Sequence, residues 1–495
     1  MSVESLLFHR VVAAVGLFVM IGLAWLLSSH KRRFPWRVVI GGLLMQMMLV
    51  TLILGTNSGR QIFSGLGDGF NTMLGFVDEG CRLVFGENFA QFYFAFRVLP
   101  TIVFFSSLMA VLYHVGLMQF IVRQLAVVLR HSLGTSGAES LSAAANIFVG
   151  QTEAPFVVRP YILRMTSSEL MAMMTGGFAT VAGGVLAVYV GFGIDAAHLM
   201  TASVISAPAG LLIAKVMLPE TEIPETAGSG TVMPSRETAN VIEAATHGAT
   251  EGLKLALNVA AMLIAFMGLI ALVDYVLSEV SLLVMNLIPG QQVQHGLTLA
   301  SICGYLFYPL AWLMGIEARD CFNSGQLLGL KVVANELVAY QKMSAWLAED
   351  APTREISART AVILTYALSG FSNFAAIGIQ VGGIGGLCPE RRADLARLGL
   401  RAMIGGMLAC CMTACVAGIV IGNADEDIPS SNSIESPTNG MPAATVVREP
   451  ESAGASDTQE SAGSPQRVQP IQEQTADSLF YFLSGGKPSG SAPPS

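Results

Sequence analysis

The sequence predicts an all-α polytopic membrane protein with about eight transmembrane helices, two re-entrant helical hairpins and an inverted-repeat transporter core. Three observations predict this fold class. Of the 495 residues, 53% are hydrophobic and 13% are charged, whereas a soluble domain carries about 25% charged residues. Eight apolar stretches are long enough to cross a bilayer of about 30 Å. Two other stretches place polar residues between apolar ones, and a glycine-rich span follows each of them.

The eight apolar stretches are spread over the first 422 residues. The first of them is long, lacks a small-residue cleavage site and is followed by the basic sequence HKRRFPWR. We therefore expect it to stay in the membrane rather than to be removed as a signal peptide. The stretches cover approximately residues 11–29, 36–54, 93–119, 168–193, 197–217, 252–276, 360–385 and 399–422.

Basic residues predict the orientation, because short cytoplasmic loops collect Lys and Arg. One cluster follows the first span (Lys31 to Arg37), one follows the third (Arg123 and Arg130), and one precedes the last (Arg391 to Arg401). All three lie on one side of the membrane if the N terminus is outside, and eight crossings return the C terminus to the same side. We expect a multi-pass membrane protein with both termini outside, which is the periplasmic side if the membrane is the bacterial inner (plasma) membrane.

Residues 134–160 and roughly 317–346 are apolar in part but do not fit as crossings. A charged carboxylate at membrane depth costs about 2.5–3.5 kcal/mol, so it requires a partner, a cavity or a function. Irregular backbone at this depth is tolerated only where protein or water covers it, and a re-entrant hairpin provides that cover. The polar residues in the middle of these stretches are Gln151, Thr152 and Glu153 in the first and Lys331, Asn335 and Glu336 in the second.

The span after each hairpin is rich in small residues and is expected to break at mid-membrane. These spans read MTGGFATVAGGVLAVYVG and LSGFSNFAAIGIQVGGIGG. Three crossings separate the two hairpins, so the hairpins enter from opposite faces. Paired units of opposite sense are typical of inverted-repeat secondary transporters, whose site lies at the midplane. Glu153 is then expected to face a cavity. Alternatively, it ties hairpin amides together or pairs with Arg159.

These patterns divide the chain into five segments. Residues 423–495 contain ten acidic and three basic residues without an apolar period, so we expect a disordered acidic tail whose removal after Gly422 leaves the body folded and active. The other segments are transmembrane helices 1–3 with an interfacial segment (1–133), a first repeat (134–218), a polar loop with the sixth transmembrane helix and an interfacial scaffold (219–316), and a second repeat (317–422). Each repeat consists of one hairpin and two spans.

Other classes of function find little support. The seven cysteines are odd in number, have no histidine at ligand spacing and form no CxxC pair, so we expect packed small hydrophobes rather than disulfides or metal ligands. The sequence contains no HExxH motif, nucleophile elbow or clustered intramembrane aspartates, so we predict that the protein is not an enzyme. A structural or channel-forming protein would not need two dissimilar polar hairpins.

Three segments carry a resemblance to a known family. They are GQTEAP (Gly150 to Pro155), GLKVVANELVAY (Gly329 to Tyr340) and GFSNFAAIGIQVGGIGG (Gly370 to Gly386). Over residues 1 to about 422 the chain resembles the concentrative nucleoside transporters. The resemblance implies a bacterial-type symporter that imports nucleosides with sodium by alternating access. It also implies a homotrimer in the lipid bilayer, with residues between roughly 278 and 316 in its scaffold, and no nucleic-acid partner.

The resemblance assigns the substrate site. Gln151, Thr152 and Glu153 would contact the base, and their amide, hydroxyl and carboxylate groups suit the donors and acceptors on a base edge. Glu336 would bind the ribose, because a carboxylate accepts hydrogen bonds from vicinal hydroxyls, while Lys331 and Asn335 satisfy loose backbone groups or orient the loop. The remaining implied contacts are Asn373 on the ribose and Phe371 and Val185 on the base; without the family, ordinary packing is the simpler reading of the last two.

The coupling ion implied by the resemblance is sodium. Its ligands would be side chains and backbone carbonyls of Asn146, Val149, Thr180 and Val181, with Thr152 close by. Oxygen ligands of this hard kind suit an alkali cation. Some members of the family use protons, and a titratable Glu153 would serve that alternative.

The chain departs from the family pattern at one position. Ala376 stands where the family usually carries a serine, three residues after Asn373. A hydroxyl partner for the ribose is therefore absent, unless the unwound backbone turns Ser372 inward. This loss supports the alternative of a related gate-domain transporter for another small polar solute.

Overall fold

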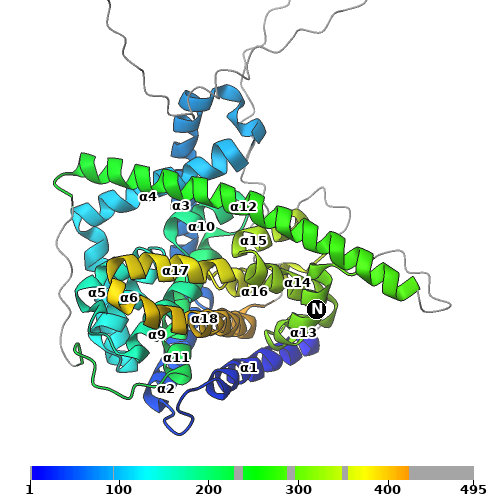
Figure 1. Cartoon of the computed structure of the whole chain (residues 1–495), viewed down its shortest axis with the longest axis horizontal. Helices are drawn as coiled ribbons and strands as arrows, with labels where there is room; N and C mark the ends of the chain where they lie inside the picture. Colours follow the sequence, from blue (N-terminus) through cyan, green and yellow to red (C-terminus); the bar gives the residue numbers. More distant parts are fainter. Residues whose placement is uncertain (1–2, 93, 228–237, 287–295, 348–354, 423–495) are drawn as a thin grey trace, which may run out of the picture. The chain divides into compact units, whose positions relative to one another are not determined.

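The computed structural model describes residues 3–92, 94–227, 238–286, 296–347 and 355–422, and the secondary structure in these ranges is helical (Figure 1). Seven of the described helical segments are long and apolar enough to cross a membrane. They correspond to seven of the eight predicted spans. The eighth, predicted at 360–385, consists of two shorter apolar helices. The predicted acidic tail lies outside the described residues.

The N-terminal part contains three spans and a long helix that the sequence analysis missed. Six glycines in this helix, α3, weaken the helical signal, because glycine costs about 1 kcal/mol in a helix interior. The hydroxyl of Thr56 caps its N terminus by accepting a hydrogen bond from the Gly59 amide at 3.0 Å. The elements are α1 (Val3–Leu26), α2 (Trp36–Leu54), α3 (Asn57–Phe85), a 3-10 turn (Glu87–Phe92), a π-helical turn (Phe94–Val98), α4 (Leu99–Val115) and α5 (Leu117–Leu133).

The first repeat begins with the predicted hairpin, here called hairpin 1 (137–162). Its return limb is divided into two short helices, which begin at Ala154 and Arg159, and a proline is the second residue of each. Proline lacks a backbone donor and is tolerated in the first turn of a helix. The elements are α6 (Gly137–Asn146), α7 (Ala154–Val157), α8 (Arg159–Ile162), α9 (Ser167–Ala179), α10 (Gly183–Gly191) and α11 (Ala196–Met217). The expected mid-membrane break separates α9 from α10.

The helix α12 (Val241–Asn286) is much longer than the predicted span at 252–276. It runs alongside α4 (Figure 1). Two glycines permit this close approach, because a Cβ atom at Gly248 would lie 2.6 Å from the carbonyl oxygen of Ser106, and one at Gly252 would lie 2.8 Å from the Cβ of Ser106.

The second repeat contains hairpin 2 (318–347) and the second broken span. The helices α13 and α14 meet at 119°. A break at residues 369–373 separates α16 from α17, as the glycine-rich pattern predicts. The helix α13 (Leu299–Leu313) precedes this repeat, whose elements are α14 (Ala318–Val333), α15 (Glu336–Leu347), α16 (Ala358–Leu368), α17 (Phe374–Leu387), a 3-10 turn (Pro389–Arg391) and α18 (Arg392–Val420).

Candidate functional site

The breaks of the two broken spans lie against each other. A helix that ends inside the protein leaves its last carbonyl groups without intrahelical donors. At the end of α9, the hydroxyl of Ser372 donates to the Phe178 carbonyl at 2.8 Å, and the thiol of Cys410 lies 3.6 Å from the Ala179 carbonyl oxygen. Gly370 fits this contact only because it lacks a side chain, since a Cβ atom there would lie 2.5 Å from the Phe178 oxygen. Ser372 therefore caps a helix end, and its one hydroxyl proton is already donated.

The end of α16 is satisfied by residues of hairpin 2. The ammonium group of Lys331 donates to the Ala367 carbonyl at 2.8 Å, and the hydroxyl of Tyr340 donates to the Thr365 carbonyl at 2.7 Å. At the tip of the hairpin, the Asn335 side-chain oxygen accepts from the Val338 amide at 2.9 Å. These contacts confirm the prediction that Lys331 and Asn335 satisfy backbone groups around the hairpin.

Glu336 is a buried carboxylate at the start of α15 in hairpin 2. It is 4% exposed. One carboxylate oxygen accepts from the Tyr189 hydroxyl at 2.9 Å, and the other accepts from the Asn373 amide at 3.1 Å. A carboxylate offers about four lone-pair positions, so about two remain for a ligand. The oxygen of the Asn373 side chain caps α17 by accepting from the Ala376 amide at 2.8 Å. The Asn373 side chain thus caps the N terminus of α17 and also donates a hydrogen bond to the Glu336 carboxylate.

The tip of hairpin 1 meets the same half-helix further along. The amide nitrogen of Gln380 donates to the side-chain oxygen of Gln151 at 2.9 Å. Thr152 lies beside Gly383, where an added Cβ atom would be 3.2 Å from its methyl group. Asn373 and Gln380 are seven residues apart, which is about 10 Å along a helix axis. The two hairpin tips therefore contact α17 about two turns apart.

The predicted ion ligands gather where hairpin 1 meets the first break. The Gly183 amide donates to the Phe148 carbonyl at 3.0 Å and so joins α10 to the hairpin. The hydroxyl of Thr180 donates to the Gly176 carbonyl at 2.9 Å. A Cβ atom at Gly176 would lie 3.3 Å from the Asn146 amide nitrogen, so Asn146 and Thr180 adjoin the same turn of α9.

The oxygen atoms of this cluster fit a hard cation. The side-chain oxygen of Asn146 is buried and accepts no hydrogen bond from the described residues. Val149 and Val181 are 5% and 1% exposed and lie in non-helical backbone. A buried oxygen without a donor is unfavourable unless a water molecule or a cation satisfies it. The donor set matches the preference of alkali cations for oxygen ligands.

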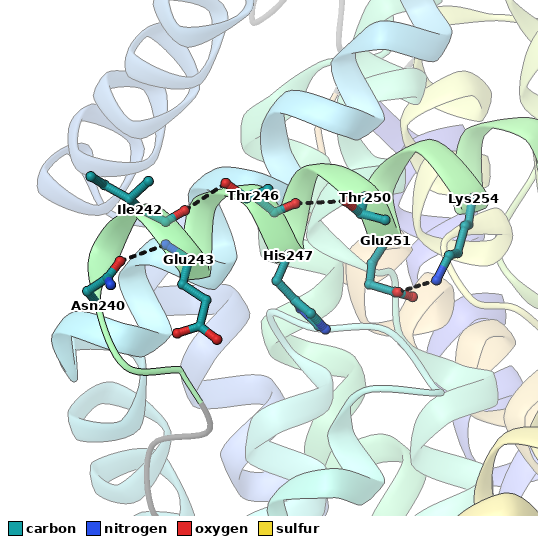
Figure 2. Close-up of a pocket in the computed structure, with 8 residues that line it drawn as sticks. All are labelled: Asn240, Ile242, Glu243, Thr246, His247, Thr250, Glu251 and Lys254. Carbon is teal, nitrogen blue, oxygen red and sulfur yellow. Dashed lines mark hydrogen bonds and ion pairs between the residues drawn. The ribbon is translucent and has the colours of Figure 1, made fainter.

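Glu153 is an exposed residue between α6 and α7 of hairpin 1. Within the described residues it forms no ion pair with Arg159. That it ties backbone amides of the hairpin together stays a prediction. A surface hollow of about 700 Å³ lies along the N-terminal part of α12 (Figure 2), and Glu153 does not line it. That Glu153 faces a cavity stays a prediction. The hollow is lined by Asn240, Ile242, Glu243, Thr246, His247, Thr250, Glu251 and Lys254.

Comparison with known proteins identifies the family. The family model described as "Na+ dependent nucleoside transporter C-terminus" matches residues 198–418, its N-terminal counterpart matches 15–88, and a "Nucleoside recognition" gate model matches 95–196. An uncharacterized transporter of Haemophilus influenzae is 45% identical over 415 residues, which cover 82% of this chain and 97% of the relative. The chain belongs to the Na⁺-dependent nucleoside transporters. It is a secondary active transporter of the membrane and not a soluble protein.

Other relatives of this Na⁺-dependent nucleoside transporter support alternating access. Human solute carrier family 28 member 3 is 42% identical over 83% of this chain, which spans 60% of the human protein. The structure of CNTnw in an inward-facing substrate-bound state is 42% identical, covers 84% of this chain and 98% of its own, and superposes with a TM-score of 0.77. A CNTnw variant in an outward-facing state superposes with a TM-score of 0.78. It is 42% identical, and the match covers 83% of this chain and 98% of the CNTnw chain.

The sequence analysis missed two residues that contact the candidate site. Tyr189 and Gln380 hold Glu336 and Gln151, respectively. A single glutamine inside the apolar segment FAAIGIQVGGIGG was a usable signal for Gln380, because a buried amide requires partners. Tyr189 lies among apolar residues and gave no signal distinct from packing. Val185 is buried and Phe371 is half-buried. This fits both a contact with the base and ordinary packing, the two roles considered for them.

Proposed function

We propose that this transporter binds the sugar of a nucleoside at Glu336 and Asn373 and the base at the tip of hairpin 1. The observation that carries the proposal is the buried carboxylate of Glu336, whose two oxygens each accept one hydrogen bond from the protein. The lone pairs that remain suit two vicinal hydroxyls. A buried carboxylate with unused acceptor capacity is costly unless a ligand uses it.

The base end is formed by Gln151, Thr152 and Glu153, which offer an amide, a hydroxyl and a carboxylate. Val185 and Phe371 supply apolar surface on which a planar base can pack. At the sugar end, Ala376 contributes a methyl group, and its amide is already used by Asn373. A sugar hydroxyl near Ala376 would then form its hydrogen bond with water rather than with a side chain at this position.

Sodium is the proposed occupant of the oxygen cluster between hairpin 1 and the break of the first broken span. Asn146 and Thr180 would supply side-chain oxygens, and Val149 and Val181 would supply backbone carbonyls. Bound there, the sodium ion would couple nucleoside uptake to its own electrochemical gradient. Because Thr152 follows Asn146 and Val149 in hairpin 1, the ion would also fix the backbone that carries the base contacts. We propose inward transport, without chemical change to the substrate.

The oligomeric state, the type of membrane and the orientation of the termini are also proposed, on the basis of the family and of the basic clusters. We expect a homotrimer in a bacterial inner membrane, with both termini outside. Crosslinking in lipid should yield trimers, whereas a purely monomeric product would contradict the assembly. A periplasmic reporter joined to the C terminus should be active if the orientation is correct.

Counterflow of labelled uridine in proteoliposomes tests the binding assignment. Preloaded unlabelled uridine should drive labelled uridine inward, and free uracil or free ribose should replace it poorly because each fills one end of the site. Equal exchange by uracil alone would show that the sugar end is not used. Loss of sodium dependence combined with a requirement for acid outside would instead favour proton coupling.

A further inference from the structure

Gln380 is buried in the middle of α17, and its orientation is determined by its surroundings. It is 0% exposed. Its amide nitrogen donates to the Met174 carbonyl at 3.1 Å and to the side-chain oxygen of Gln151 at 2.9 Å. A backbone carbonyl can only accept, so the group of Gln380 that faces Met174 must be the NH₂ group.

The orientation of Gln380 fixes the orientation of Gln151. Because Gln380 presents its NH₂ group, the atom of Gln151 that meets it must be the carbonyl oxygen. The NH₂ group of Gln151 makes no hydrogen bond to the described residues and is the end left for a ligand. Gly177 makes the contact possible, because a Cβ atom there would lie 2.8 Å from the Gln380 nitrogen and 2.9 Å from the Gln151 Cβ.

The two repeats contain equivalent hydrogen bonds between a broken span and the opposite hairpin. Tyr189 and Gln380 are each the seventh residue of the second half of a broken span, counted from Gly183 in α10 and from Phe374 in α17. Each donates a hydrogen bond at 2.9 Å to the hairpin of the opposite repeat, Tyr189 to Glu336 and Gln380 to Gln151. The equivalence of position indicates that Gln380 is part of the site's construction and not an isolated core amide.

We propose that Gln380 is a positioning residue for base recognition, which holds Gln151 with its NH₂ group toward the ligand and so selects bases whose facing edge offers an acceptor. This inference rests on the proposed base contact of Gln151. Without Gln380 the Gln151 amide can rotate, and its carbonyl oxygen can then face the base.

A double-mutant cycle tests whether Gln380 acts through Gln151. Sodium-driven uridine uptake is measured in proteoliposomes for wild type, Gln380→Met, Gln151→Ala and the double variant. We expect Gln380→Met to raise KM about fivefold, the effect of one ordinary hydrogen bond, with kcat little changed. In the Gln151→Ala background it should have no further effect. An equal loss in both backgrounds would overturn the proposal, because it would mean that Gln380 contacts the base itself or supports the fold.

Two further variants complete the test. Gln151→Glu keeps the acceptor that meets Gln380 but removes the NH₂ group, so it should lose uridine uptake as severely as Gln151→Ala; retained uptake would show that the opposite end of Gln151 faces the base. Gln46→Met is the matched control, since Gln46 is also a fully buried glutamine, whose nitrogen donates to the Gly42 carbonyl at 3.2 Å in α2. Its KM should equal that of wild type. If the wild-type protein transports no nucleoside, the proposed function itself is rejected. If Gln380→Met has the same effect with and without Gln151, only the role of Gln380 is rejected.

Discussion

Replacing Tyr189 with phenylalanine removes one hydroxyl from the sugar end of the site. That hydroxyl donates to Glu336 at 2.9 Å, and both residues are buried. The ring remains able to pack on Tyr340, whose centroid lies 4.5 Å away. A hydrogen bond to a charged group contributes about 1.5–3 kcal/mol, which corresponds to about 10- to 150-fold in affinity. We therefore expect Tyr189→Phe to raise the KM for ribonucleosides within that range while the protein stays folded.

The assay compares uridine with 2',3'-dideoxyuridine in proteoliposomes. The dideoxy compound lacks the hydroxyls proposed to bind Glu336, so its weaker uptake should not change in Tyr189→Phe. Tyr340→Phe is the matched control, because it removes a buried hydroxyl that donates to the Thr365 carbonyl at 2.7 Å without touching Glu336. Equal losses for both nucleosides, or equal losses in the two tyrosine variants, would refute the argument that Tyr189 positions the carboxylate.

Four other variants give separate tests. Glu336→Gln should keep the fold and weaken ribonucleoside uptake by about 1.5–3 kcal/mol, and unchanged uptake kinetics would remove Glu336 from the site. Asn146→Ala should lower the response of uptake to external sodium at fixed pH, and an unaltered sodium dependence would contradict the ion assignment. Ala376→Ser should tighten ribonucleosides more than their 2'-deoxy or 3'-deoxy analogues, whereas a uniform change would indicate packing. Lys215→Met leaves the carboxylate of Glu139, 2.6 Å from the Lys215 nitrogen, buried without that partner, so thermal unfolding in detergent should show a loss of about 3–5 kcal/mol; an unchanged melting temperature would count against this ion pair.

The positions of the hairpins and breaks could be predicted because their signal is local. Polar residues such as Gln151 and Glu336 inside apolar sequence are costly at membrane depth, and glycine-rich spans permit broken helices. The pairing of these elements could not be predicted. Tyr189 and Glu336 are 147 residues apart, and Gln151 and Gln380 are 229 residues apart. Hydrophobic periodicity contains no information about contacts at such separations.

Helix lengths were also underestimated where composition was mixed. The helix α3 was missed because glycines and polar residues interrupt its apolar face, and α12 extends well beyond the apolar stretch that predicted it. Ser372 illustrates the same limit at the site. Its sequence position allowed a contact with the sugar or a packing role, and only the fold places its hydroxyl on the Phe178 carbonyl.

Uphill accumulation of a nucleoside in a sodium gradient tests the central claim most directly. Purified protein in proteoliposomes should concentrate labelled uridine above the external level when sodium is high outside, at equal pH on both sides. Replacing sodium with choline or collapsing its gradient should reduce the internal level to equilibrium. Accumulation that follows a proton gradient and ignores sodium would contradict the coupling, and a failure to concentrate any nucleoside would contradict the account of transport.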